Sequence, residues 1–187
     1  MKRRVVSLVL SFFLAVISAA SAAEYREEIP FVPTPLEVID RMLELAQVKK
    51  GDVLYDLGSG DGRIVIRAAQ KYGIHAIGIE MDRLLLEQAR RDAKVAGVTK
   101  LVEFRAADAL KANISKATVV TLYMLPWFNE AMKPSFRRQL KPGSRIVAHD
   151  FGIEGWEPDE TMKLPGYEEK IGGYKHQHVL YLWKMKK

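Results

Sequence analysis

Short apolar runs alternate with helical patterns along most of this chain. DVLYDL precedes RIVIRAAQKY, HAIGIE precedes DRLLLEQARRDAKVA, and LVEFRA, ATVVTLYML, WFNEAMKPSFRRQL and SRIVAHDF continue the series. Such alternation builds βαβ units. It predicts an α/β fold with a doubly wound, mostly parallel Rossmann-like sheet and helices on both faces. The last apolar run, GYKHQHVLYLWKM, predicts an antiparallel C-terminal strand.

A helix is predicted ahead of the first strand, in FVPTPLEVIDRMLELA. Thr34 is expected to be its N-cap, with Pro35 at the first helical position and Glu37 completing a capping box. Apolar residues at helical spacing predict one face that packs on the sheet. They are Leu36, Ile39, Met42, Leu43 and Ala46.

The beginning of the chain is typical of a targeting signal. Three basic residues precede an uncharged apolar stretch, and an A-x-A cleavage pattern ends at Ala22. We predict a signal peptide over residues 1–22 and a single domain over residues 23–187. The alternative is an uncleaved anchor, because the uncharged stretch is long enough to span a bilayer. Either alternative makes the domain exported, periplasmic or membrane-anchored.

Charge and cysteine content exclude several kinds of function. Without the signal peptide, 26 basic residues face 23 acidic ones, so the net charge is +3 in place of +6. This balance argues against a nucleic-acid partner. The chain has no cysteine, which excludes disulfides, thiolate zinc sites and cysteine nucleophiles. We predict no metal site.

The stretch DLGSGDGR, residues 56–63, places three glycines directly after the first predicted strand. Glycine allows positive φ and lets a ligand approach the backbone, and doubly wound sheets bind nucleotides at this edge. The dinucleotide pattern G-x-G-x-x-G would need a glycine at position 63, which is Arg63. A phosphate-binding P-loop would need a Lys-Ser or Lys-Thr pair, which the turn lacks. Both of these nucleotide sites are therefore disfavoured.

Acidic residues follow three successive predicted strands: Asp56, Glu80 and Asp108. A carboxylate at Glu80 suits two adjacent ribose hydroxyls, and Asp108 can accept a hydrogen bond from an adenine amino group. Each acid alone is more often a solvated loop residue. Their order along the strands predicts a site for an adenosine that carries a cationic group in place of phosphates.

At these residues the sequence resembles the class I S-adenosylmethionine-dependent methyltransferases, over residues 30–151. More closely, it is similar to bacterial relatives of the lysine N-methyltransferases that modify the ATP synthase c subunit and the adenine nucleotide translocase. FVPTP, DLGSGDGRIVI and TVVTLYMLP carry this similarity. The resemblance implies S-adenosyl-L-methionine as cofactor, bound by the glycine turn at its methionine end and by the later acids at the ribose and adenine. The implied cofactor-binding residues are Asp56, Gly58, Ser59, Gly60, Gly62, Glu80 and Asp108.

The resemblance also implies a protein lysine as the methyl acceptor. A lysine amine, with a pKa of about 10.4, is protonated at neutral pH and must lose a proton before it attacks the methyl group. Tyr123, His149 and Asp150 are the candidate catalytic residues, because they lie at the ends of the fourth and fifth predicted strands. The alternative for each is a structural role.

Other acceptors remain open at this point. Base methyltransferases of this class usually carry Asn/Asp-Pro-Pro-aromatic after the fourth strand, whereas this chain reads Tyr123-Met-Leu-Pro126. A base is therefore disfavoured, and we predict a protein substrate, associated with a membrane. A small-molecule acceptor is one alternative. Another is an exported non-catalytic module that binds the cofactor, since S-adenosylmethionine is made in the cytoplasm. The FVPTP segment is expected to cover the cofactor as a lid.

Overall fold

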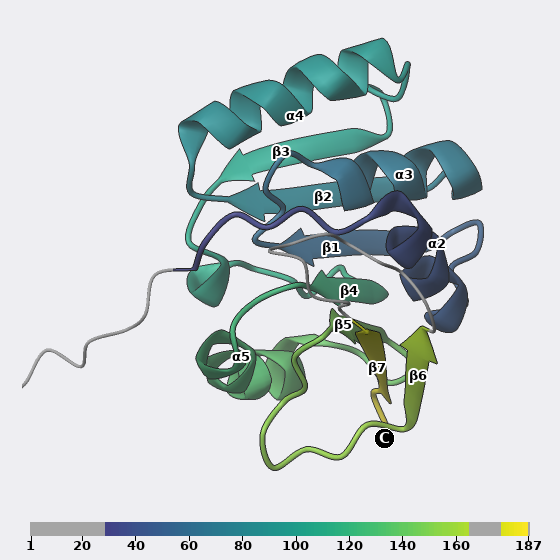
Figure 1. Cartoon of the computed structure of the whole chain (residues 1–187), viewed down its shortest axis with the longest axis vertical. Coiled ribbons are helices and arrows are strands. Elements are labelled where there is room, and N and C mark those ends of the chain that lie inside the picture. The colour runs from purple at the N-terminus through teal and green to yellow at the C-terminus, as the bar shows by residue number, and fades with distance from the viewer. Residues whose placement is uncertain (1–28, 165–176, 187) are drawn as a thin grey trace, which may run out of the picture. The chain divides into compact units, whose positions relative to one another are not determined.

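The structure is a computed structural model that describes residues 29–164 and 177–186 (Figure 1). Contacts group Phe31–Lys187 as one unit, and the description below concerns the described residues of this unit. The predicted signal peptide, residues 1–22, lies outside the described residues. Within the described ranges, no helix has the length and apolar character needed to cross a membrane.

Seven strands form one sheet in the order β3-β2-β1-β4-β5-β7-β6. The first five strands of the chain are parallel. β7 runs antiparallel between β5 and β6, so the predicted antiparallel C-terminal strand is confirmed. The strands are β1 (Val53–Leu57), β2 (His75–Glu80), β3 (Val102–Ala106), β4 (Val119–Leu122), β5 (Arg145–His149), β6 (Glu160–Leu164) and β7 (His178–Lys184).

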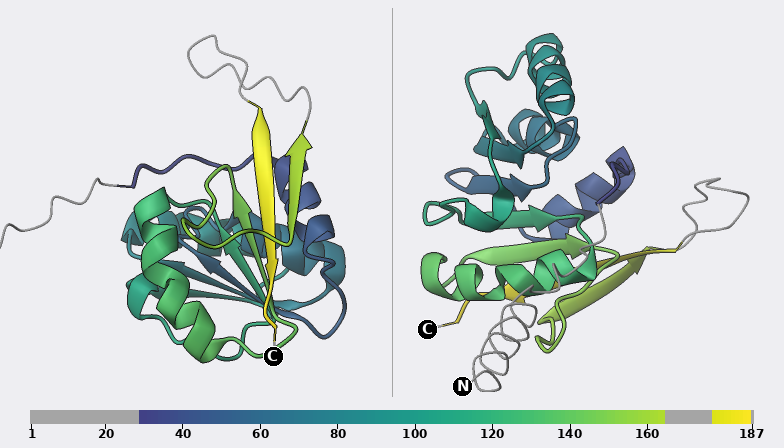
Figure 2. Two further views of the ribbon diagram at one scale, coloured as in Figure 1. Left: turned by 90° about the horizontal axis from the view of Figure 1, so that it is seen from below. Right: turned by 90° about the vertical axis from the view of Figure 1, so that its left-hand side faces the viewer.

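Helices cover both faces of the sheet, as the sequence predicted. Figure 2 shows α5 on one face and α2 and α3 on the other. α3 ends at Gly73, which has φ +63, and the Asp82 side chain caps α4 by accepting from the N–H groups of Leu84 and Leu85. The helices are α2 (Leu36–Leu45), α3 (Arg63–Tyr72), α4 (Arg83–Val95), the short 3₁₀ helix η1 (Ala109–Lys111) and α5 (Pro126–Gln139).

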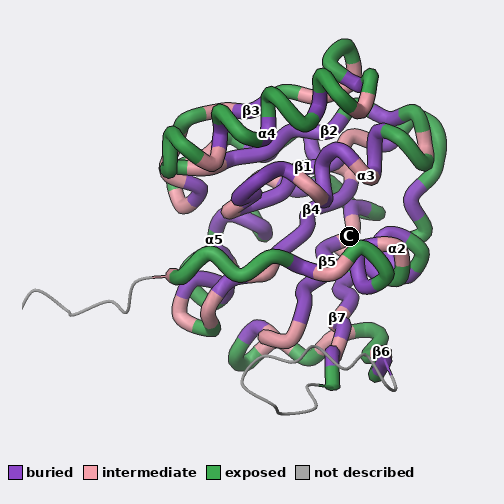
Figure 3. Tube along the Cα trace, turned by 45° about the horizontal axis from the view of Figure 1, so that its top comes forward, coloured by how far each residue is buried: buried purple, intermediate pink, exposed green. Residues whose placement is uncertain are grey.

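The largest apolar cluster lies between the sheet and the layer of α2, α3 and α4. Alternate strand residues, among them Leu54, Val119 and Val147, pack there against helical residues such as Val65 and Leu86. This follows from the strand period of two, which sends successive side chains to opposite faces. The inner strands β1, β2, β4, β5 and β7 are therefore buried along most of their length, whereas α4 keeps an exposed outer face (Figure 3).

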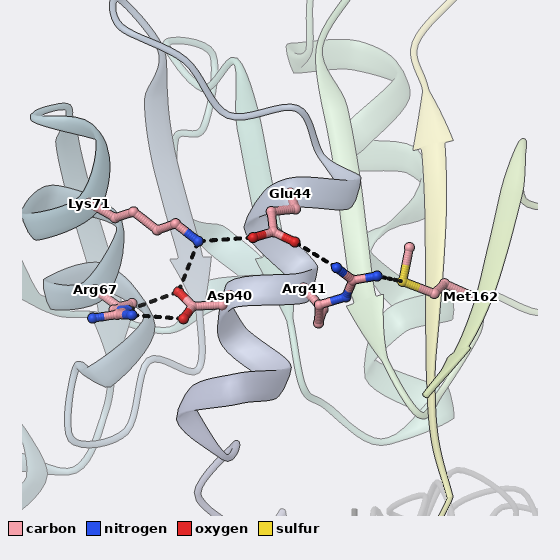
Figure 4. Close-up of polar contacts among 6 residues, drawn as sticks. All are labelled: Asp40, Arg41, Glu44, Arg67, Lys71 and Met162. Atoms are coloured by element: carbon pink, nitrogen blue, oxygen red, sulfur yellow. Dashed lines mark hydrogen bonds and ion pairs between the residues drawn. The ribbon is translucent and has the colours of Figure 1, made fainter. Parts of the chain in front are cut away.

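Polar contacts tie α2 to α3 at the surface of this layer (Figure 4). The Arg67 guanidinium donates two hydrogen bonds to Asp40, at 2.9 and 2.7 Å, and they lower the pKa of that carboxyl. Lys71 bridges Asp40 and Glu44, with Nζ to oxygen distances of 3.4 and 3.0 Å. The helix that leads into the site is thus fixed to the helix that follows the glycine turn.

Two local predictions were wrong. Pro35, and not Thr34, occupies the N-cap of α2, and no side chain caps it, because the buried Thr34 hydroxyl lies 3.4 Å from Nδ1 of His149. Leu36, expected on the apolar face, is 58% exposed. β6 was not predicted at all, since this edge strand, ETMKL, has mostly exposed residues and carries no apolar run.

Candidate active site

The glycine turn follows β1 and is held against β2. The N–H groups of Gly58 and Ser59 both donate to the Ile79 carbonyl, at 2.9 and 3.0 Å, and the Gly62 N–H donates to Ser59 O at 2.9 Å. Gly58, Gly60 and Gly62 have φ values of +77, +53 and +77. This conformation favours glycine over residues with a side chain, so the spacing of the three glycines follows from the backbone path.

Two of these glycines let other side chains approach the turn closely. A Cβ on Gly58 would collide with Sδ of Met124, and one on Gly60 would lie 2.5 Å from the Phe31 ring. At Gly62 the neighbours are internal, because a Cβ would meet Phe104 at 2.6 Å. Gly62 therefore lets α3 pack closely against β3. Contact between Gly62 and a cofactor remains a prediction from the sequence.

Position 63, where a dinucleotide site would have glycine, is an arginine whose side chain links the glycine turn to the segment before α2. Arg63 donates to both carboxylate oxygens of the buried Asp61, from Nε at 3.0 Å and from Nη2 at 2.7 Å. Its Nη1 donates to the Thr34 carbonyl at 3.1 Å. Three residues before Thr34, the half-exposed Phe31 ring packs over Gly60. The segment expected to form a lid thus lies on the glycine turn.

Glu80 ends β2 and faces the same turn. Its Oε2 accepts from the Gly60 N–H at 2.9 Å, and its Oε1 accepts from the N–H groups of Met81 and Asp82 at 2.7 and 2.9 Å. A carboxylate has about four acceptor positions, so one remains for a ribose hydroxyl. A second hydroxyl would take the place of one of these amides.

Asp108 lies at the neighbouring strand end. Ala106 pairs with Glu80 in the sheet, and the Ala107 N–H donates to the Glu80 carbonyl at 3.1 Å. The Asp108 Oδ1 caps η1 through the Leu110 N–H at 2.9 Å, and its Oδ2 lies 3.4 Å from Lys111 Nζ. The two acids predicted for ribose and adenine are therefore at adjacent positions of one sheet edge.

Asp56 is buried at the end of β1, and burial raises the pKa of its carboxyl to about 7. The charges of Glu80 and Asp61 raise the pKa further, while the Thr121 hydroxyl, which donates to Asp56 Oδ1 at 2.6 Å, lowers it. A cation that binds nearby would favour the ionised form. The site thus contains an acid that titrates near neutral pH and is suited to a cationic ligand.

Ser59 provides a further polar group inside the turn. Its buried Oγ has no hydrogen-bond partner among residues 29–164 and 177–186, and a Cβ on Gly78 would lie 2.5 Å from it. Buried hydroxyls normally have a partner, so this one is available to a polar ligand atom. The bare turn, this hydroxyl and the acids fit the adenosine, sulfonium and amino-acid groups of S-adenosylmethionine.

The candidate catalytic residues come together at the next strand ends. Leu57, Leu122 and Ala148 are register partners across β1, β4 and β5, so the residues that follow them, Gly58, Tyr123 and His149, continue one row. The ring centroids of Tyr123 and His149 are 4.0 Å apart, and the His149 Nε2 lies 3.2 Å from Asp150 Oδ2.

His178 joins this cluster and was missed from the sequence. Its Nδ1 lies 2.8 Å from the Nε2 of His149 and 3.4 Å from Asp150 Oδ2. The signal was present in the run HQHVLYLWK, because an antiparallel strand beside β5 brings its first residue to the carboxyl end of β5. We predicted the strand but not its neighbour in the sheet, so the approach of His178 to His149 was not foreseen.

Comparison with known proteins agrees with this geometry. The ANTKMT methyltransferase domain family matches residues 56–160. A protein-lysine N-methyltransferase from Saccharolobus islandicus is 40% identical over 159 residues, covering 84% of this chain and 96% of that protein. The human lysine N-methyltransferase of the ATP synthase c subunit is 33% identical over 133 residues, which cover 71% of this chain and 56% of the human protein.

A solved structure shares both the fold and much of the sequence. It is an RNA methyltransferase from Salinibacter ruber in complex with S-adenosyl-L-homocysteine, 51% identical, with a TM-score of 0.76 over 83% of this chain and 95% of that one. S-adenosyl-L-homocysteine is what remains of S-adenosylmethionine after its methyl group has been transferred. The molecule bound in that structure is therefore the product form of the cofactor that the glycine turn is suited to hold. The chain belongs to the ANTKMT methyltransferase domain family and is an S-adenosylmethionine-dependent methyltransferase.

Proposed function

We propose that this methyltransferase transfers the methyl group to a lysine side chain of a protein substrate. The observation that carries the proposal is the row of strand ends at which Gly58, Tyr123 and His149 follow one another across β1, β4 and β5. A cofactor on the glycine turn would present its methyl group toward this row. Lysine methylation by the Saccharolobus islandicus and human relatives supports the same acceptor.

The residues of the chain supply orientation and a route for a proton. The cofactor, when bound, supplies an electrophilic methyl group on its sulfonium. Glu80 and Asp108 fix the adenosine end, so that the methyl group faces the acceptor in line, and such orientation contributes several kcal/mol or more. Tyr123, His149 and Asp150 take the proton that the lysine must lose, because they form one cluster in direct contact.

An RNA acceptor is the contrasting expectation, because the Salinibacter ruber protein is named an RNA methyltransferase. Two features of this chain favour a protein. The stretch from Tyr123 to Pro126 lacks the acidic or amide side chain that holds a base amine, and the net charge without residues 1–22 is only +3. RNA binding depends on a larger excess of positive charge.

The test supplies the purified full chain with S-adenosylmethionine labelled in its methyl group and with three acceptor pools: membrane proteins, soluble proteins and RNA. We expect label in protein, recovered as methyl-lysine after acid hydrolysis and identified by mass spectrometry. The Gly58→Arg variant is the control and should transfer none. Label that ribonuclease releases, or label only in small molecules, would contradict the lysine proposal.

We also propose that the domain is exported or anchored outside the cytoplasm, together with a membrane-associated substrate. The signal-like segment over residues 1–22 supports this location, although S-adenosylmethionine is made inside the cell. A fusion of alkaline phosphatase after Pro30 tests it, because that enzyme is active only after export. We expect activity that is lost when residues 1–22 are deleted. An inactive fusion with the segment present would place the domain with its cofactor in the cytoplasm.

A further inference from the structure

Three side chains at the end of β5 and the start of β7 converge on one point. The Nε2 of His149, the Nδ1 of His178 and the Oδ2 of Asp150 are 2.8, 3.2 and 3.4 Å from one another. The side chains are almost fully buried, with exposed fractions of 0% for His149, 1% for His178 and 8% for Asp150. The three atoms therefore form a closed triangle inside the protein.

The backbone is bent in a way that produces this triangle. Successive residues of a strand point to opposite faces, so His149 and Asp150 would normally diverge. Asp150 has φ +58, a left-handed conformation that aspartate tolerates better than most residues. This turn brings the Asp150 carboxylate to the same side as the His149 ring, and both then meet His178.

The size of the triangle matches the coordination of a transition-metal ion. Nitrogen and oxygen ligands lie about 2.0–2.2 Å from a tetrahedral zinc ion, which separates neighbouring ligand atoms by roughly 3.3 Å. The observed separations of 2.8, 3.2 and 3.4 Å lie around this value, and only the two histidine nitrogens would have to move apart appreciably. A single proton links two atoms, whereas a cation at the centre would accept a lone pair from all three.

Two of the three candidate ligands, Asp150 and His149, have outer contacts of the kind that metal ligands usually have. The second Asp150 oxygen, Oδ1, accepts from the Val179 N–H at 2.9 Å. The second His149 nitrogen, Nδ1, lies 3.4 Å from the Thr34 hydroxyl. Ligating histidines and carboxylates are commonly held by such partners, which fix the orientation of the ring and of the carboxylate.

The donor types select the ion. Two imidazoles and one carboxylate suit divalent transition metals such as zinc, cobalt, nickel or iron, whereas magnesium and calcium prefer oxygen ligands throughout. We predicted no metal site from the sequence, and the structure leads to a different view. We propose that His149, Asp150 and His178 bind a divalent transition-metal ion. The proposal does not depend on the identity of the methyl acceptor, but an ion bound here would take the lone pairs of His149 and Asp150, so in the metal-bound protein the proton would pass to Tyr123.

Cobalt is the first probe, because its visible absorption reports both binding and geometry. The full chain, stripped of metal with a chelator, would be titrated with Co²⁺ and then with Zn²⁺ as competitor. We expect one equivalent of Co²⁺ per chain, with intense bands of a four-coordinate ion, and its displacement by one equivalent of Zn²⁺. Folded wild-type protein that develops no such bands would overturn the proposal.

Variants locate the ion. His178→Gln and Asp150→Asn each remove one ligand and should weaken Co²⁺ binding more than a hundredfold. His75→Gln is the matched control, because His75 is exposed, and it should bind as the wild type does. Circular dichroism and the melting temperature of the metal-free proteins check folding. Unchanged binding by either ligand variant would assign the ion to another place and overturn the site.

Thr34→Val gives a test that leaves every ligand in place. It removes only the hydroxyl beside His149, and we expect affinity for Co²⁺ to fall about tenfold, as for other partners of metal ligands. This variant keeps the proposal testable if the ligand variants fail to fold. Equal affinity in Thr34→Val and wild type would contradict the part of the proposal that assigns His149 as an oriented ligand.

Discussion

The two halves of the sheet differ in how their functional residues are assembled. In the cofactor half, β1 to β3, the turn and its acids come from one stretch, residues 56–108, and the Gly60–Glu80 contact spans 20 residues. In the acceptor half, β4 to β7, His149 meets His178 across 29 residues and Thr34 across 115. A site built from one stretch can be identified from a motif, whereas a site built by strand order needs the fold.

The sharpest test of the cofactor half is Gly58→Ala. The added Cβ would sit at a positive φ and displace the Met124 side chain, and it would add a side chain to the turn that holds the cofactor, so we expect S-adenosylmethionine affinity, measured by calorimetry, to fall more than a hundredfold. Gly73→Ala is the control, because Gly73 has φ +63 and open space around it. It should cost about 1 kcal/mol of stability and leave affinity unchanged. Equal losses in both variants would mean that backbone strain, and not the site, is responsible.

The acceptor half should affect turnover without affecting cofactor binding. In the metal-free protein, His149→Gln removes a proton acceptor, and general-base groups contribute about 10²–10⁴-fold to rate, so we expect kcat to fall about a hundredfold. Affinity for S-adenosylmethionine should stay within twofold of wild type. Single-turnover methylation and calorimetry give the two values. If affinity fell as much as kcat, the two halves would not be functionally separate.

Glu80→Gln should have a smaller effect on the cofactor half. Both Glu80 oxygens accept from backbone N–H groups, so either orientation of an amide would place its NH₂ group against a donor. We expect affinity for S-adenosylmethionine to fall about tenfold, or about 1.4 kcal/mol. Glu87→Gln, on the exposed face of α4, is the control. An equal or larger loss in the control would contradict the assignment of Glu80 to the ribose.

The smallest expected effect is a pH dependence from Asp56. Its pKa is raised to about 7 in the folded protein, from a usual 3.8, so between about pH 4 and 7 the folded state holds a proton that the unfolded state has lost. Stability from this group therefore falls as pH rises through that window. A cationic cofactor favours the carboxylate, so its affinity should rise a few-fold from pH 6 to 8.

Asp56→Asn separates this group from the others. The variant cannot ionise, so both pH dependences should flatten in calorimetry and in thermal unfolding. Asp92→Asn, exposed on α4, should keep the wild-type profile. An unchanged profile in Asp56→Asn would assign the titration to another group.

The sequence predicted the parallel strands, α3, α4 and α5 and the acids at the strand ends, because periodicity and glycine spacing are local signals. It did not predict β6, whose edge position requires little apolar surface, nor the burial of Thr34. The cap prediction failed because a tertiary contact with His149 took the threonine hydroxyl. His178 was missed for the same reason, since its partner is set by the order of β5 and β7 in the sheet.

The short segment before α2 has a kinetic consequence. Phe31 packs over Gly60, and Thr34, three residues later, contacts both Arg63 and His149. A displacement of Phe31 that admits the cofactor would also move Thr34, which contacts His149 in the acceptor cluster. Binding should therefore be ordered, with the cofactor entering before the acceptor, and product inhibition by S-adenosyl-L-homocysteine should be competitive toward the cofactor and noncompetitive toward the acceptor.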